Sequence, residues 1–155
     1  MRILVVSDSH GDEFTLKYVI QQQPLAEVII HLGDGCNDME NVKSSFPNKK
    51  IVQIKGNCDF CCRSPLTSVE QFCGKKIFCT HGHAENVKFT QNELILKAQK
   101  EGADIALYGH THVPVIDYVD GLYLFNPGSV RQGEYGFIDI TQSGIVCNNL
   151  VVNFI

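Results

Sequence analysis

Short apolar runs that end in polar clusters recur along the first third of the chain. Three such runs are rich in β-branched residues, as strands buried on both faces of a sheet are: Arg2 to Ser7, Glu27 to His31 and Lys50 to Ile54. Between the first two runs, apolar positions at helical spacing predict an amphipathic helix that ends before Pro24: Phe14, Leu16, Val19 and Ile20. Strands that alternate with helical stretches predict parallel βαβ units with right-handed crossovers.

From Thr67 onward the pattern changes to that of a hairpin, with strands Ser68 to Cys73 and Lys76 to Cys79 joined at Gly74-Lys75. A helix near Gln91 to Glu101 is predicted next. Five short strands follow: Ile105 to Tyr108, Val113 to Val119, Leu122 to Phe125, Gly136 to Ile140 and Ile145 to Val152. We therefore expect an α/β protein with two sheets packed face to face and helices outside, in one domain over residues 1–155.

The overall charge gives the chain no basic surface of the kind that coats nucleic acid. The 155 residues carry a formal net charge of -4, with a pI near 5.8, so we expect no stable nucleic-acid binding. The apolar run at the N-terminus is too short for a signal peptide or a membrane span. These features predict a cytoplasmic protein without membrane contact, and leave open a homo-oligomer.

Seven cysteines in a chain without an export signal predict reduced thiols rather than a disulfide framework. Cys79 and Cys147 lie in apolar runs and are expected in the core. Four others could form a small zinc knuckle, but the second half lacks a matching pair, so buried or loop thiols are the commoner interpretation: Cys58, Cys61, Cys62 and Cys73.

Five of the six histidines sit in three polar clusters, each next to a predicted strand: Asp8-Ser9-His10, His81-Gly82-His83 and Gly109-His110-Thr111-His112. In an extended segment, residues i and i+2 point to the same side, so two ligands can converge on one point. Asp34 between two glycines can bridge two ions, and Asn57 offers a carbonyl ligand. His31, alone on an apolar strand, is expected to be an ordinary core histidine. Seven side chains are thus candidates for a dinuclear centre about 3.5 to 4 Å across: Asp8, His10, Asp34, Asn57, His81, His110 and His112.

The ordered set of motifs resembles the calcineurin-like metallophosphoesterases: Asp8-x-His10, Gly33-Asp34, Gly56-Asn57-Cys58-Asp59, His81-Gly82-His83 and Gly109-His110-Thr111-His112. Its length and the turn Asn126-Pro127-Gly128-Ser129 are similar to the small microbial YfcE-type phosphodiesterase branch. The resemblance implies a four-layer α-β-β-α sandwich of two mixed sheets flanked by helices. It also implies one metal held by Asp8, His10, Asp34 and His112, and a second held by Asp34, Asn57, His81 and His110.

The activity implied by this resemblance is hydrolysis of a phosphodiester by a hydroxide that bridges two divalent ions. Mn²⁺ is the expected metal, and Ni²⁺, Fe²⁺, Co²⁺ and Zn²⁺ also fit nitrogen and oxygen ligands. Two such ions with Asp8 and Asp34 leave a charge of about +2, or about +1 once a hydroxide is bound. A phosphodiester would neutralise this charge and a phosphomonoester would exceed it. The expected substrate is a small phosphodiester, with a nucleotide as one option.

Cys58 departs from larger relatives, in which a histidine at this position is thought to protonate the leaving group. A thiol with an ordinary pKa of about 8.5 is a poor substitute for imidazole. Asp59 and His83 are the alternative helpers, so the predicted catalytic residues are Asn57, Asp59 and His83.

Four other polar residues have weaker assignments. Ser9 and Thr111 are expected to hydrogen-bond the loops rather than to react. Arg131 and Lys55 could reach a phosphate oxygen, although such side chains are usually solvated.

Three other functions remain open from the sequence. A phosphomonoesterase would use the same residues. The retromer subunit of eukaryotes has this fold and is a protein-binding scaffold with an incomplete site, whereas all four predicted histidine ligands are present here. A zinc-knuckle binding module depends on the cysteines alone.

Overall fold

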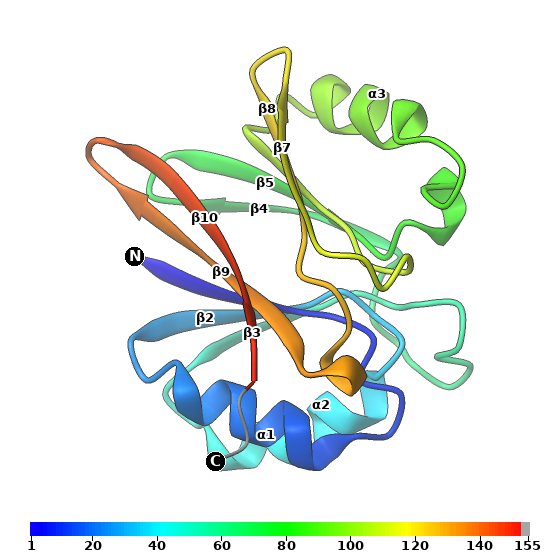
Figure 1. Cartoon of the computed structure of the whole chain (residues 1–155), viewed down its shortest axis with the longest axis vertical. Coiled ribbons are helices and arrows are strands. Elements are labelled where there is room, and N and C mark those ends of the chain that lie inside the picture. Colours follow the sequence, from blue (N-terminus) through cyan, green and yellow to red (C-terminus); the bar gives the residue numbers. More distant parts are fainter. Residues whose placement is uncertain (153–155) are drawn as a thin grey trace.

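The protein is built from two five-stranded sheets that face each other, with helices on both outer sides (Figure 1). The computed structural model describes residues 1–152. The strand order is β10-β9-β1-β2-β3 in the first sheet and β4-β5-β6-β8-β7 in the second. The predicted sandwich of two mixed sheets flanked by helices is confirmed.

The first sheet combines three parallel strands with an antiparallel pair. Strand β1 pairs in parallel with β2, which pairs in parallel with β3, while β9 runs antiparallel to both β1 and β10. The strand bounds are β1 Arg2–Val6, β2 Ala26–His31, β3 Lys50–Gln53, β9 Glu134–Thr141 and β10 Gly144–Val151.

The second sheet has the same mixture, with β5, β6 and β8 parallel and the edge strands β4 and β7 antiparallel to their neighbours. Its strand bounds are β4 Thr67–Phe72, β5 Lys75–Thr80, β6 Ile105–Leu107, β7 Val115–Val119 and β8 Leu122–Asn126. The sequence located these strands to within one residue of their ends, except that β9 begins two residues earlier and β7 two residues later than predicted.

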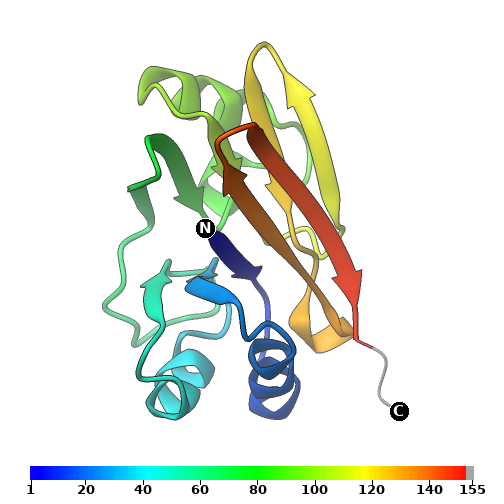
Figure 2. The same ribbon diagram turned by 90° about the vertical axis from the view of Figure 1, so that its left-hand side faces the viewer.

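Helices α1 and α2 cover the outer face of the first sheet, and α3 covers that of the second (Figures 1 and 2). The helices are α1 Glu13–Gln22, α2 Cys36–Val42 and α3 Asn92–Lys100, with 3-10 turns η1 Lys43–Ser45, η2 His83–Glu85 and η3 Val130–Gln132. The Asp12 carboxylate caps α1 by accepting the Thr15 N–H. Helix α2 was not predicted, and Phe14, predicted on the apolar face of α1, is 74% exposed.

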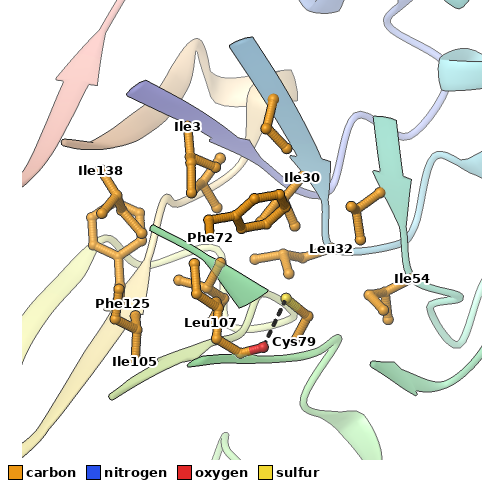
Figure 3. Packing of buried hydrophobic residues seen from close by; sticks show 14 of the residues in the cluster. Ile3, Ile30, Leu32, Ile54, Phe72, Cys79, Ile105, Leu107, Phe125 and Ile138 are labelled. Atoms are coloured by element: carbon orange, nitrogen blue, oxygen red, sulfur yellow. Dashed lines mark hydrogen bonds between the residues drawn. The ribbon is translucent and has the colours of Figure 1, made fainter. Parts of the chain in front are cut away.

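Alternating side chains of the central strands divide the core into three layers. On β1, Ile3 and Val5 point between the sheets, while Leu4 and Val6 pack against the helices. Figure 3 shows how side chains of both sheets meet in the inner layer, where Ile30 and Leu107 lie with Phe125 and Phe72. Strand β1 is therefore buried on both sides, as its β-branched sequence predicts.

The prediction of seven reduced cysteines is wrong at one pair. A disulfide joins Cys36 at the start of α2 to Cys62, across a sequence separation of 26 residues. The other five cysteines are free; Cys79 is buried as expected, and Cys147 is half-buried against the inner core. Pairing depends on which loops the fold brings together, and the sequence pattern does not contain that information.

Candidate metal centre

All the predicted ligands lie at the carboxyl ends of parallel strands. Asp8 and His10 follow β1, Asp34 follows β2, Asn57 follows β3, His81 follows β5, and His110 and His112 follow β6. Because parallel strands end at the same edge, three loops of the first sheet and two of the second meet at one rim of the sandwich. The topology thus converts five separated motifs into neighbours.

Backbone hydrogen bonds fix these loops to one another. The N–H groups of Asp8 and His10 donate to the carbonyls of Gly33 and Asp34 at 2.9 and 3.0 Å. The His110 N–H donates to Asp8 Oδ2 at 3.0 Å and joins the two sheets. The ligand loops are therefore supported by each other rather than by solvent.

Five of the candidate ligands have left-handed backbone conformations, with φ between 46° and 65°: Asp8, His10, Asp34, His110 and His112. The prediction that i and i+2 side chains converge because the segment is extended is therefore wrong in its geometry, although the side chains do converge. Non-glycine residues pay an energetic penalty in this region, and such strain persists where the surrounding structure imposes it. Its concentration here marks this rim as a functional site.

The first group of ligating atoms joins the β1 and β6 loops. His10 Nε2 and His112 Nε2 are 3.3 Å apart, and Asp8 Oδ1 lies 3.1 Å from His112 Nε2 and 3.6 Å from His10 Nε2. Asp8 is fully buried and its Oδ2 accepts the Ser7 hydroxyl at 2.5 Å. These three side chains could hold a metal ion.

The second group is centred on His81, whose side chain is fully buried. Its Nδ1 donates to the Leu32 carbonyl at 2.7 Å, which directs the lone pair of Nε2 into the site. Nε2 lies 3.1 Å from Asn57 Oδ1 and 3.4 Å from Asp34 Oδ2. Asp34, His81 and His110 form a second set that could hold a metal ion.

Asp34 lies between the two groups. Its Oδ2 is 3.9 Å from His10 Nε2 of the first group and 3.4 Å from His81 Nε2 of the second, while its Oδ1 accepts the Cys58 N–H at 2.7 Å. Burial by itself would raise the pKa of Asp34, but the interaction with the neighbouring His81 ring and the hydrogen bond from the Cys58 N–H outweigh it and hold that pKa well below its ordinary value. Asp34 is therefore a carboxylate at neutral pH.

The spacing of these donor atoms fits divalent ions. A tetrahedral ion with ligands at about 2.1 Å separates those ligands by roughly 3.4 Å, and right-angled ligands by about 3.0 Å. The distances of 3.1 to 3.4 Å among the closest atoms match this range. His81 Nε2 faces the oxygens of Asn57 and Asp34, an arrangement that a proton on this nitrogen or a bound metal ion would satisfy.

The histidines of the two groups differ in pKa. Burial, together with the charges of His81 and Lys88, lowers the pKa of His110 to about 4. Burial opposes protonation of His81 too, but the carboxylates of Asp34 and Asp8 raise its pKa above the ordinary value. His110 is thus neutral, as a metal ligand must be.

The predicted helpers are placed differently from the ligands. The Asp59 carboxylate accepts four backbone N–H groups, from Asp34, Gly35, Cys36 and Gly56, at 2.7 to 3.0 Å. The His83 ring lies beside the ligand rings, 5.5 Å from His81 and 6.2 Å from His110 between centroids. Within residues 1–152, His83 Nδ1 is buried and has no hydrogen-bond partner.

Cys58 stays a thiol in this setting. Burial and the nearby Asp34 carboxylate raise the pKa of Cys58 above its ordinary value. The side chain is exposed beside the site and within reach of His10 and Asp34.

Several supporting residues were not recognised from the sequence. The Ser129 hydroxyl donates to the Asp8 carbonyl at 2.8 Å, and Asn126 Nδ2 donates to the Gly109 carbonyl and to Thr111 Oγ1, both at 3.0 Å. Both residues belong to the turn Asn126-Pro127-Gly128-Ser129, which was the sequence feature that could have identified them.

A second buried network lies beneath the β1 loop. Asp38 accepts the Ser9 hydroxyl at 2.5 Å and the Gly11 N–H at 2.9 Å, and Ser9 also contacts His31. His31 is fully buried, as expected for a core histidine, and burial lowers its pKa. The predicted role of Ser9 in hydrogen-bonding the loops is confirmed.

One cleft lies beside the ligands, and a larger cavity lies at the opposite end of the first sheet. A cleft of about 510 Å³ adjoins the ligands and includes His10, Asp34 and Arg131 in its wall. A larger cavity of about 810 Å³ lies at the amino ends of β1 to β3, among Leu25, Phe46 and other residues. Because none of the candidate ligands lines the larger cavity, the chemistry belongs to the smaller cleft.

Comparison with known proteins agrees with the geometry. Residues 1–142 match the family model described as the calcineurin-like phosphoesterase superfamily domain. The "Probable metallophosphoesterase YsnB" of Bacillus subtilis (strain 168) is 32% identical over 132 residues, which cover 84% of this chain and 76% of YsnB. The "Phosphodiesterase YfcE" of Escherichia coli (strain K12) is 26% identical over 180 aligned residues, covering 96% of this chain and 93% of YfcE.

Solved structures show the same fold in proteins of two kinds. A "predicted phosphoesterase" of Streptococcus pneumoniae TIGR4 superimposes with a TM-score of 0.81 at 31% identity, covering 97% of this chain and 88% of the other. Vps29 of Entamoeba histolytica complexed with zinc superimposes with a TM-score of 0.75 at 18% identity, covering 99% of this chain and 100% of Vps29. In the part of our chain that the structure describes, no helix is long and apolar enough to span a membrane.

Proposed function

Because the chain belongs to the calcineurin-like phosphoesterase superfamily and is a hydrolase of that class, we propose that it is a phosphodiesterase with two divalent ions at the rim of its sheets. The first ion would be held by Asp8, His10, Asp34 and His112. The second would be held by Asp34, Asn57, His81 and His110. Ions bound there would lower the pKa of coordinated water and polarise phosphoryl oxygens.

The observation that carries this proposal is the position of Asp34 between two groups of nitrogen and oxygen ligands. Its Oδ2 is within 3.9 Å of His10 Nε2 and 3.4 Å of His81 Nε2. A single ion would need only one of these groups. The Cys58 N–H fixes the other oxygen of Asp34, so the carboxylate is oriented before an ion binds.

The surrounding residues orient the ligands and shield them. Leu32 fixes the His81 tautomer through its carbonyl, and Ser7 donates to Asp8 Oδ2, which leaves Oδ1 facing the rings of His10 and His112. Asp59 is a positioning residue in this scheme, because all its acceptor capacity is directed at backbone N–H groups. His83 faces the ligand rings with an unpartnered nitrogen, so we assign it contact with the substrate or its leaving group.

The finer points of the proposal come from charge and ligand chemistry. A pair of divalent ions with two carboxylates and a bound hydroxide leaves about one positive charge, which a phosphodiester neutralises. Small diesters, including those of nucleotides, are therefore the proposed substrates, and Mn²⁺ is the proposed metal. The cytoplasmic location and the oligomeric state stay predictions.

The test is hydrolysis of bis(p-nitrophenyl) phosphate by purified protein loaded with Mn²⁺. We expect about two equivalents of bound metal and measurable p-nitrophenol release. His110→Ala or Asp34→Asn should abolish hydrolysis while circular dichroism shows folded protein. Absence of activity with Mn²⁺, Ni²⁺, Co²⁺ and Zn²⁺ in turn would contradict the proposal.

A scaffold function is the second candidate, because the Vps29 structure has the same fold over nearly the whole chain. The two functions differ in their need for bound metal and turnover. Inactive protein that still binds metal would favour the scaffold. Faster hydrolysis of p-nitrophenyl phosphate than of the diester would instead identify a phosphomonoesterase.

A further inference from the structure

The cleft beside the ligand groups has room for part of a substrate. At about 510 Å³ it falls within the size range of small-molecule sites. Two of its lining residues, His10 and Asp34, belong to the proposed metal centre. The rest come from Gly11, the start of α2, the loop after β3, and η3, and they include Asp38, Asp59, Phe60 and Arg131. A phosphodiester held at the ligands would therefore extend one of its two substituents into this cleft.

Among the described residues 1–152, Arg131 is the one arginine or lysine that lines this cleft. Its side chain is exposed, and among residues 1–152 no hydrogen bond or ion pair of its guanidinium is found. The carboxylates that share the cleft have other roles: Asp34 belongs to the proposed metal centre, Asp38 accepts from Ser9 and Gly11, and Asp59 accepts four N–H groups. The positive charge of Arg131 is thus available to a ligand.

The backbone at Arg131 is fixed against the ligand loop. The Val130 N–H donates to the Ser7 carbonyl at 2.9 Å, and the Arg131 N–H donates to the Asp8 carbonyl at 3.4 Å. The Ser129 hydroxyl donates to the same carbonyl. The guanidinium therefore extends from a base that is fixed relative to the proposed metal centre.

We propose that this cleft binds one substituent of the phosphodiester and that Arg131 pairs with a second phosphate carried by that substituent. This inference rests on the proposed function. A planar guanidinium matches phosphate oxygens through two parallel hydrogen bonds. The charge of the scissile diester is already balanced at the ligands, so Arg131 selects for an additional anion. Phe60, 87% exposed in the same cleft, offers an aromatic ring to a nucleobase.

Two matched esters test this proposal: thymidine 5′-(p-nitrophenyl phosphate) and the same compound with a 3′-phosphate. Both release p-nitrophenol and differ only by the second phosphate. With the Mn²⁺-loaded protein, we expect kcat/KM to be about 10-fold or more higher for the 3′-phosphorylated ester, mainly through KM. Arg131→Met should reduce this ratio to about one, and Arg131→Lys should leave an intermediate ratio because lysine keeps the charge without the planar fork.

Arg63→Met is the matched control, because Arg63 is also exposed but lines a neighbouring hollow rather than this cleft. It should retain the wild-type ratio. A wild-type ratio of one, or an Arg131→Met variant that keeps the ratio or loses both activities equally, would overturn the proposal. If neither ester is hydrolysed, the proposed function fails. Calorimetry with thymidine 3′,5′-bisphosphate then tests the cleft separately: binding that Arg131→Met weakens about 10-fold supports it, and equal or absent binding refutes it.

Discussion

The carboxylate of Asp59 accepts the backbone N–H of Asp34 at 2.7 Å, across 25 residues of sequence. The same carboxylate accepts the N–H groups of Gly35, Cys36 and Gly56. It therefore caps the start of α2 and joins the β2 loop to the β3 loop, which carries Asn57. One side chain thus sets the separation of two proposed metal ligands.

Asp59→Asn should lower both stability and metal affinity. An amide nitrogen at either oxygen position would face two N–H donors and leave them unpaired, at a cost of about 2 kcal/mol or more. Metal affinity should fall about 10-fold or more, as for other residues that orient ligands. Urea unfolding in EDTA and calorimetric Mn²⁺ titration measure the two effects.

Asp12→Asn provides the control for this substitution. Asp12 caps α1 through one N–H, a role that asparagine performs equally well, so neither quantity should change. Wild-type metal affinity in Asp59→Asn would show that Asp59 does not position the ligand loops.

The edge of the sandwich that carries the site could be predicted because it depends on strand direction alone. Apolar runs such as Arg2–Val6 are buried on both sides, which makes a parallel arrangement the physically consistent one. Once the strands are parallel, Asp8 and Asp34 must meet at their shared carboxyl edge. The positions of the ligands therefore followed from pattern and topology.

The local geometry of the site could not be predicted, because it depends on contacts between distant segments. His10 has a φ of 46° since its N–H is held by the Asp34 carbonyl, and no local signal requires that conformation. Helix α2 was missed for a similar reason. It has seven mostly polar residues, and its first N–H is capped by Asp59 from a loop 23 residues further along the chain.

Gly56→Ala should disrupt the site by steric conflict. A Cβ at this position would lie 2.1 Å from Asp34 Oδ1 and 2.4 Å from the Asp34 backbone nitrogen. The Asp34 carboxylate would have to move, so we expect a loss of about 1 to 3 kcal/mol in stability and at least about a 10-fold loss in metal affinity. Thermal unfolding and Mn²⁺ titration are the measurements.

Gly74→Ala separates this effect from backbone strain. A Cβ at Gly74 has no neighbour within 4 Å, but its φ of +77° is unfavourable for alanine. This variant should lose about 1 kcal/mol of stability and keep its metal affinity. If Gly56→Ala also keeps its metal affinity, Asp34 is not held against Gly56 as the structure indicates.

The metal-free protein should lose stability as the pH falls from about 6.5 toward 4, in part because of His110. The pKa of His110 in the folded chain is about 4, below the ordinary value of 6.5. Between these values the unfolded chain binds a proton that the folded chain does not, so the free energy of unfolding decreases as the pH falls. Urea unfolding in EDTA at several pH values measures this slope.

In His110→Asn, unfolding should take up as much as one proton fewer between pH 6.5 and 4. The free energy of unfolding of the variant should therefore rise relative to that of wild type as the pH is lowered through this range. His81 acts in the opposite direction, because its pKa is raised, but it is common to both proteins and cancels in the comparison. Identical slopes for the two proteins would mean that His110 has an ordinary pKa.

Reduction of the Cys36–Cys62 disulfide should destabilise the protein more than it changes the metal site. The bond closes a loop of 26 residues, for which the chain-entropy model gives about 3.5 kcal/mol. Asp59 continues to join the same two loops in the reduced chain, so Mn²⁺ affinity should change less than about threefold. Alkylation in denaturant without reductant should modify the five free cysteines, and prior treatment with reductant should expose two more. Cys36→Ser should reproduce the loss of stability, whereas Cys61→Ser, next to the disulfide but outside it, should not. Alkylation of all seven cysteines in denatured protein that has not been reduced would instead show the reduced state that the composition predicts.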